Sequence, residues 1–101
     1  MLKHITSREQ FLDAIKEGTV IVDFYATWCG PCKMLTPVLE QLSEENPDVT
    51  ILKVDVDEVS SLSAQFGIQA VPTLLLFKGG QQIDMRLGYQ NKNQLLNFIN
   101  Q

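Results

Sequence analysis

The chain has 101 residues, of which 45% are hydrophobic, with 8 basic and 12 acidic side chains and a net charge of −4. This length is typical of one domain, so we expect a single domain over residues 1–101. The negative charge and the scattered lysines and arginines argue against a binder of nucleic acid or of anionic membranes, because both need a cationic surface.

The N-terminal segment and the longest apolar stretch bear on localisation. The first residues, MLKHITSREQF, lack the apolar core of a signal peptide, and TLLLF is too short to cross a bilayer. We therefore expect a cytoplasmic protein. Stable disulfides are uncommon in that compartment, where a cysteine pair is more often catalytic or metal-binding than structural.

Residues 6–18 predict the first helix. Ser7 can cap it, and Gln10 is expected to complete a capping box. Three apolar side chains should share its buried face, namely Phe11, Leu12 and Ile15. Residues 20–26, VIVDFYA, form a nearly continuous apolar run, which is typical of a central strand covered on both faces.

The middle of the chain continues the alternation of helices and strands. Residues 34–46 have helical spacing, and Pro37 should bend this helix because proline removes a backbone donor. Residues 49–57 alternate as a strand, and residues 58–67 predict a short helix.

Residues 73–88 predict a hairpin, with two strands joined at a Gly-Gly pair. Residues 91–101 predict the last helix, with Asn91 as its cap and with inward-facing side chains at Leu95, Leu96 and Ile99. A small strand around residues 3–5 would extend the sheet. Alternation predicts parallel pairing and the hairpin an antiparallel edge, so we expect an α/β fold with a mixed sheet flanked by helices.

Both cysteines, Cys29 and Cys32, lie in the sequence WCGPC, where a strand ends and a helix begins. The unpaired N–H groups of a first helical turn carry partial positive charge. They should stabilise a thiolate on Cys29 and lower its pKa below the free value of about 8.5. Pro31 suits the first helical positions, and Gly30 leaves the approach to the sulfur open.

The spacing of the two thiols supports a two-step exchange. Cys29 would attack an external disulfide, and Cys32 would then attack Cys29 and release the partner as a dithiol. A structural disulfide is disfavoured because so short a loop constrains the unfolded chain little. A closed zinc site needs four ligands and the only histidine, His4, is remote in sequence, although a site shared between two chains stays conceivable.

Other residues could assist this pair. Asp23 interrupts the predicted central strand; burial would raise its pKa and make it a proton acceptor near neutrality, whereas on an exposed face it would simply meet solvent. Lys53 could neighbour Asp23 on an adjacent strand, although the pattern alone favours a solvent-facing lysine. Trp28 is expected at the rim of the turn as a flat contact surface, with a core aromatic as the alternative. His4 is expected on the surface or on an edge strand.

Together these residues resemble the thioredoxin family over essentially the whole chain. The resemblance rests on VDFYATWCGPCKM, Pro37 in the following helix, Lys53, VPTLLLFKGG and Gly88. It implies the thioredoxin fold, a central mixed sheet of four or five strands flanked by helices. It also implies a protein-disulfide reductase.

The resemblance further implies a role for each catalytic candidate. Cys29 would be the exposed nucleophile and Cys32 the resolving thiol. Asp23 would be the buried carboxylate that assists deprotonation of the resolving cysteine through water, and Lys53 the lysine that tunes that carboxylate.

The resemblance also implies a docking surface, made of Trp28, Gly30, Pro31, Val71, Pro72 and Gly88. Pro72 would be a cis-proline facing the disulfide, and Val71 would offer backbone groups to an extended substrate segment. Two residues depart from the family pattern. Tyr25 stands where many members have a second tryptophan, and Tyr89 should reshape the docking groove because smaller residues are expected there.

Family members bind no cofactor and are usually recycled by a thioredoxin reductase that draws on NADPH. The expected partners are therefore that reductase and disulfide-containing proteins, with the chain itself a monomer. Oxidising or isomerising relatives often carry a histidine between the cysteines, whereas Gly-Pro supplies no such charge, so we predict a reductant. The alternatives are an oxidant or isomerase of the same fold, a redox-inactive binding subunit, and a metal-bridged dimer.

Overall fold

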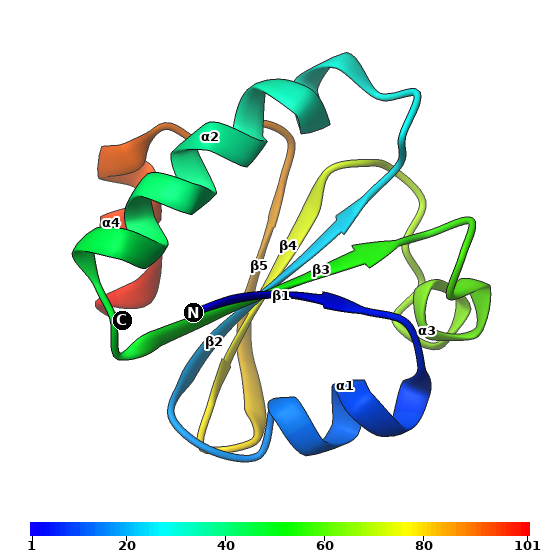
Figure 1. The fold of residues 1–101 in the computed structure, drawn as a ribbon, viewed down its shortest axis with the longest axis horizontal. Coiled ribbons are helices and arrows are strands. Elements are labelled where there is room, and N and C mark those ends of the chain that lie inside the picture. Colours follow the sequence, from blue (N-terminus) through cyan, green and yellow to red (C-terminus); the bar gives the residue numbers. More distant parts are fainter.

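The computed structural model describes residues 1–101 as one five-stranded sheet with helices on both faces (Figure 1). In chain order the elements are β1 (Leu2–Ile5), α1 (Arg8–Ala14), β2 (Thr19–Tyr25), α2 (Gly30–Glu45), β3 (Val49–Asp55), α3 (Ser60–Gln65), β4 (Thr73–Lys78), β5 (Gln81–Leu87) and α4 (Lys92–Ile99). None of the helices has the length and apolarity needed to cross a membrane.

The sheet has the strand order β1-β3-β2-β4-β5 and is mixed, as predicted. Strands β1, β3 and β2 run parallel, while β4 is antiparallel to both β2 and β5. The apolar run of β2 therefore lies in the middle of the sheet, between β3 and β4. In Figure 1, α1 and α3 lie on one side of the sheet and α2 and α4 on the other.

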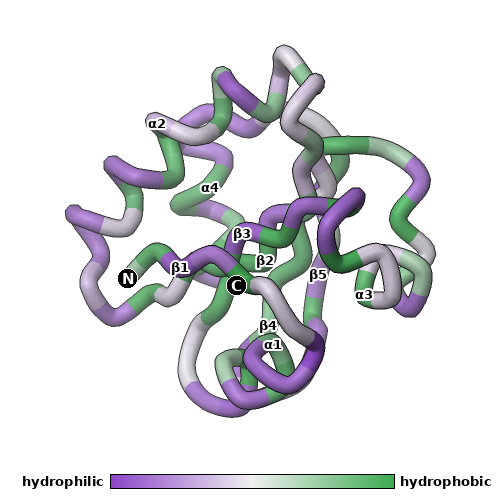
Figure 2. Tube along the Cα trace, turned by 45° about the vertical axis from the view of Figure 1, so that its right-hand side comes forward, coloured by the Kyte–Doolittle hydropathy of each residue, from purple (hydrophilic) through white to green (hydrophobic).

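Alternate residues of the strands feed two separate apolar clusters, because successive side chains of a strand point to opposite faces. The cluster on the α1/α3 face contains Ile5, Phe11, Val20, Val22, Phe24, Leu52, Val54, Val59, Leu62, Leu75 and Phe77. The cluster on the α2/α4 face contains Ile21, Leu35, Leu39, Leu42, Val49, Ile51, Leu74, Leu76, Leu95, Phe98 and Ile99. In Figure 2 the hydrophobic stretches follow β2 and β4, while hydrophilic and hydrophobic residues alternate along α2.

The cap residues Ser7 and Asn91 are confirmed, whereas the capping box predicted at Gln10 is wrong. The Ser7 side chain accepts a hydrogen bond from the Gln10 amide, but Gln10 Oε1 accepts from the Thr6 amide instead of closing a box on Ser7. The cap at Asn91 is a full capping box with Gln94. Both helices therefore begin where their polar cap residues predict.

Some predicted helical details differ from the structure. Helix α1 ends at Ala14, short of Gly18, and Leu12 is 41% exposed because Phe11 alone turns fully into the core. Helix α3 is limited to Ser60–Gln65 and has no side-chain cap. In α4, Leu95 and Ile99 are buried as predicted and Leu96 is half-buried, whereas the fully buried Phe98 was not predicted.

Candidate active site

The cysteine pair lies where β2 ends and α2 begins, as the sequence predicts. Cys29 is the N-cap of α2, with extended backbone angles of φ −93° and ψ 116°. Its Sγ accepts a hydrogen bond from the amide of Cys32, with a nitrogen–sulfur distance of 3.2 Å. Pro31 occupies the first turn, where its missing donor leaves no helical hydrogen bond unmade. The helix N-terminus therefore directs an N–H group at the Cys29 sulfur.

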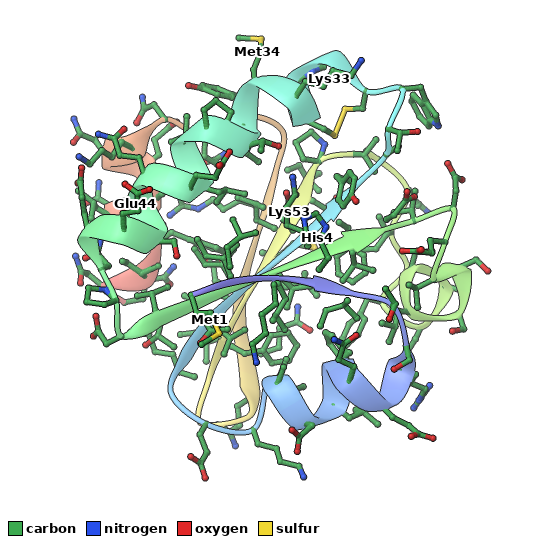
Figure 3. The ribbon with its side chains drawn as sticks, viewed as in Figure 1. Met1, His4, Lys33, Met34, Glu44 and Lys53 are labelled. Carbon is green, nitrogen blue, oxygen red and sulfur yellow. A yellow bond between two sulfur atoms is a disulfide. The ribbon has the colours of Figure 1, made fainter.

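Cys29 and Cys32 form a disulfide, and their Cα atoms are 5.3 Å apart. Figure 3 shows this bond at the N-terminal end of α2. Cys29 is 5% exposed and Cys32 is 2% exposed, so the expectation of an exposed Cys29 is wrong for the disulfide form. Three neighbouring side chains cover the pair, namely Tyr25, Val56 and Val71. Cys29 is nevertheless the more accessible of the two sulfur-bearing residues.

The loop before β4 faces the disulfide. The Val71–Pro72 peptide bond is cis, in agreement with the family resemblance. The Val71 carbonyl oxygen lies 3.7 Å from Cys29 Sγ, a contact rather than a hydrogen bond because a disulfide sulfur has no proton to donate. The Gly88 amide donates to the Pro72 carbonyl over 2.8 Å, and Gly88 has a positive φ of 84°. The structure therefore brings Val71, Pro72 and Gly88 together beside Cys29.

An exposed surface surrounds the disulfide. Trp28 is 69% exposed, so it lies at the rim as predicted, and its Nε1 donates to Asp57 Oδ2 over 3.2 Å. Gly30 and Pro31 are also exposed, and Tyr89 is 41% exposed. Beside Trp28 is a mainly apolar hollow of about 300 Å³, lined by Trp28, Val56, Ser63, Ile68, Gln69, Ala70 and Val71. This surface can receive an extended segment next to Cys29.

Asp23 and Lys53 are paired across β2 and β3 and are both buried. The solvent-facing lysine that the local pattern favours is therefore wrong. Lys53 Nζ lies 3.9 Å from Asp23 Oδ2, but it donates its hydrogen bond to Thr36 Oγ1 over 2.7 Å. Neither carboxyl oxygen of Asp23 has a hydrogen-bond partner.

Burial raises the pKa of Asp23 from 3.8 to about 7, and the nearby Lys53 ammonium offsets only part of this rise. The carboxyl group is therefore close to half-ionised near neutral pH. Lys53 Nζ also lies 4.5 Å from the centroid of the Tyr25 ring. Burial raises the pKa of Tyr25, and the carboxylates of Asp55, Glu58 and Asp23 raise it further.

Thr36 is the functional candidate that the sequence analysis missed. Its Oγ1 accepts from Lys53 and donates to the Cys32 carbonyl oxygen over 3.2 Å. The signal available in the sequence was its position, one helical turn after Cys32 on the side facing the sheet. Thr36 therefore connects the first turn of α2 to the buried ion pair.

His4 is exposed on β1, which is an edge strand, as expected. It is paired with Lys53 in the register of β1 and β3. No group of three or more histidine, cysteine, aspartate or glutamate side chains is arranged to hold a metal ion.

The sequence and the fold were compared with those of known proteins. A family model described as Thioredoxin matches residues 3–101. The chain belongs to the thioredoxin family. A thioredoxin of Chlamydia muridarum is 50% identical over 95 residues, which cover 94% of this chain and 93% of that protein.

Two solved structures share the fold. A thioredoxin of Malassezia sympodialis has a TM-score of 0.88 at 41% identity, covering 98% of this chain and 90% of that one. Mitochondrial thioredoxin 3 from Saccharomyces cerevisiae, in its oxidised form, has a TM-score of 0.90 at 39% identity, covering 98% of this chain and 93% of that one. The predicted thioredoxin fold is thereby confirmed.

Thioredoxins are thiol–disulfide oxidoreductases that work without a bound cofactor. This chain has the redox-active pair of the family, closed as a disulfide, and it is a protein-disulfide reductase. The alternatives of a redox-inactive binding subunit and of a metal-bridged dimer are not favoured.

Proposed function

We propose that the protein donates electrons to protein disulfides, with Cys29 as the nucleophile and Cys32 as the resolving thiol. The observation that carries this assignment is the hydrogen bond from the Cys32 amide to Cys29 Sγ at the start of α2. In the reduced protein the same N–H group and the helix dipole would stabilise a thiolate on Cys29. Cys32 lies inside the first turn, where no incoming substrate reaches it first.

The exchange moves two electrons in two steps. The Cys29 thiolate attacks one sulfur of the substrate disulfide, whose S–S bond breaks, and the other substrate sulfur leaves as a thiolate that takes up a proton. The deprotonated Cys32 then attacks Cys29 Sγ and breaks the mixed disulfide. The second substrate sulfur leaves and is protonated, so the substrate becomes a dithiol and the Cys29–Cys32 disulfide is formed.

Asp23 serves as the proton acceptor for Cys32, through water. A pKa of about 7 suits this role, because the carboxyl group can both accept and release a proton near neutral pH. Lys53 favours the ionised carboxylate and thereby keeps the pKa of Asp23 from rising further. The link from Lys53 through Thr36 to the Cys32 carbonyl supports placing all of them in one unit.

The substrate segment docks in an extended conformation beside the disulfide. Val71 offers its backbone groups to that segment, in the manner of strand addition. The surrounding contacts come from Trp28, Gly30, Pro31, Pro72 and Gly88. The exposed indole of Trp28 and the adjacent apolar hollow support an apolar contact next to the reacting cysteine.

The family relationship supports the remaining assignments. Thioredoxins generally receive electrons from a thioredoxin reductase, and we assign that enzyme, drawing on NADPH, as the electron donor. The reaction needs no nucleic acid and no membrane, and we place the protein in the cytoplasm as a monomer with a single domain over residues 1–101.

Reduction of insulin tests this proposal. With thioredoxin reductase and NADPH, the wild-type protein should consume NADPH and precipitate the insulin chains. Cys29→Ser and Cys32→Ser should each reduce turnover to background, since neither can complete the cycle. Turnover by Cys29→Ser at the wild-type rate would contradict the proposal.

Equilibration with glutathione distinguishes a reductant from an oxidant or isomerase of the same fold. A reductant should keep its own disulfide in a buffer that reduces a strong oxidant. Full reduction of the Cys29–Cys32 bond in that buffer would favour the oxidant.

A further inference from the structure

Three polar side chains form a row across the α2 side of the sheet. His4 is paired with Lys53 across β1 and β3, and Lys53 is paired with Asp23 across β3 and β2. Neighbouring strands are about 4.8 Å apart, and paired residues of a sheet share a face. Figure 3 shows His4 and Lys53 together between the sheet and α2. The row therefore runs from the solvent-exposed edge of the sheet to its fully buried centre.

A cavity of about 360 Å³ opens over the outer part of this row, between β1 and α2. We call it the β1–α2 cavity, and its lining residues are Leu2, His4, Thr36, Glu40, Ser43, Glu44 and Lys53. All but one of these are polar or charged. A water molecule occupies about 30 Å³ in the liquid and is retained where polar partners surround it. The cavity is thus both large enough and polar enough to hold water.

Lys53 connects the β1–α2 cavity to Asp23. Its side chain lines the cavity, and its ammonium lies 3.9 Å from the Asp23 carboxylate. Asp23 is fully buried, and neither of its oxygens has a hydrogen-bond partner. Proton release to bulk solvent needs polar groups or water, and the polar lining of the β1–α2 cavity supplies such groups beside Lys53.

We propose that the β1–α2 cavity is the solvent port of Asp23, through which the proton taken from Cys32 leaves past Lys53 and His4. His4 is then a positioning residue: it lies at the outer rim of the β1–α2 cavity and influences Asp23 only through Lys53. This inference rests on the proposed role of Asp23 as the proton acceptor of the reaction.

Titratable groups lie around Lys53 on β2, β1 and α2. Asp23 and the Tyr25 phenol face it from β2, His4 faces it from β1, and the carboxylates of Glu40 and Glu44 line the same cavity from α2. Solvent entering the cavity would screen these groups and hydrate the outer side of the ion pair. An apolar side chain that fills the cavity would remove that hydration and disfavour the ionised Asp23.

Ser43→Leu tests the port, because it fills the cavity from α2 with a good helix former. Its matched control is Ser61→Leu, the same change at an exposed position of α3 far from the cavity. The probe is the titration of the Asp23 carboxyl carbon by NMR in the oxidised protein. The pH dependence of mixed-disulfide resolution gives the second readout.

We expect Ser43→Leu to raise the midpoint of the Asp23 titration by roughly one pH unit and to shift the resolution profile by the same amount. Ser61→Leu should leave both unchanged. Equal midpoints for the two variants would overturn the inference. His4→Phe fills the cavity from β1 and provides the same test if Ser43→Leu does not fold.

The titration does not depend on catalysis, so the two proposals can fail separately. If the wild-type protein reduces no disulfide, the proposed function is wrong. A shifted Asp23 midpoint in Ser43→Leu would then still support the port. An active protein with an unshifted midpoint would end the port alone.

Discussion

The two faces of the sheet differ most at the end of β2 that leads to the cysteines. On the α1/α3 face, β2 contributes Val20, Val22 and Phe24, all fully buried in an apolar cluster. On the α2/α4 face, the same strand contributes Ile21 and then Asp23, which is equally buried but has no hydrogen-bond partner for its carboxylate. Adjacent residues of one strand thus meet opposite environments.

The α1/α3 face thus contributes mainly to stability, whereas the α2/α4 face carries the group proposed to act in the reaction. The α1/α3 face gains free energy of folding from the burial of its apolar cluster, and its aromatic rings pack edge to face, as Phe11 and Phe66 do at a centroid distance of 5.5 Å. The α2/α4 face places a buried carboxyl group without a hydrogen bond where an apolar residue would be more stable. A destabilising group of this kind is expected where it serves function, which agrees with the proton-acceptor role proposed for Asp23.

Phe24→Ala should show the largest effect on stability. It removes a fully buried aromatic ring from the α1/α3 face, and such changes cost about 3–5 kcal/mol. The loss should be the same at pH 5 and pH 8, since the ring does not titrate. Urea unfolding at both pH values measures it. A loss that differed strongly between pH 5 and pH 8 would mean that titratable groups also contribute to the stability of this face.

Asp23→Asn changes the neighbouring residue, on the opposite face of the sheet. It should raise the free energy of unfolding, whereas Phe24→Ala should lower it. The folded-state pKa of about 7 lies above the ordinary 3.8, so the wild type loses stability as the pH rises through this window and stays at its lowest above about pH 7. Removal of the carboxyl should therefore stabilise the protein at pH 8 by up to about 4 kcal/mol, at 1.36 kcal/mol per pKa unit. Below about pH 4 the gain should vanish.

Urea unfolding of Asp23→Asn at pH 4 and pH 8 measures this gain, and resolution of the mixed disulfide should become slower. Asp48→Asn is the control, because Asp48 is exposed near the start of β3. Equal stabilisation at both pH values would show that the effect does not come from ionisation of Asp23.

Lys53→Met should have an intermediate effect, confined to the α2/α4 face. The Lys53 ammonium lowers the pKa of Asp23, so its loss should raise that pKa above about 7 by roughly one pH unit. The NMR titration of the Asp23 carboxyl carbon measures the shift. Lys16→Met, at an exposed position of the chain, should leave the titration unchanged; an identical midpoint in Lys53→Met would remove Lys53 from the mechanism.

Trp28→Ala should have the smallest effect on stability and a moderate one on docking. The indole is 69% exposed, so the free energy of unfolding should change by no more than about 0.5 kcal/mol. The KM for a protein substrate should rise about fivefold, which corresponds to about 1 kcal/mol of lost contact. Leu12→Ala, an exposed apolar change on α1, serves as the control. Equal KM values for Trp28→Ala and the wild type would take Trp28 out of the docking surface.

The fold was predictable from local patterns to a large extent. The apolar run of β2, the Gly-Gly hairpin and the cap at Asn91 all lie where the sequence placed them. Helix ends were less predictable: α1 ends at Ala14 with Ile15 as its C-cap, before the glycine at Gly18, and no local signal in the sequence marks this end. Leu12 was assigned to the wrong side because α1 is too short for its periodicity to fix one face.

The site was predictable where its chemistry is local and not where it is assembled from distant segments. The helix N-terminus, Pro31 and the thiol spacing all fall within WCGPC, so Cys29 and Cys32 could be found from the sequence. The burial of Lys53 depends on Thr36 in α2 and Asp23 in β2, which no local pattern connects. The sequence allowed Lys53 to neighbour Asp23 and the family resemblance assigned it a role, whereas the position of Thr36 one helical turn after Cys32 was overlooked.

The assignment of Cys29 as attacker and Cys32 as resolver is tested most directly by trapping. Reduced Cys32→Ser is mixed with a protein disulfide, and covalent adducts are separated without reductant and identified by mass. We predict a stable mixed disulfide through Cys29, and no adduct with Cys29→Ser under the same conditions. An adduct that formed through Cys32 in Cys29→Ser, with none in Cys32→Ser, would contradict the account.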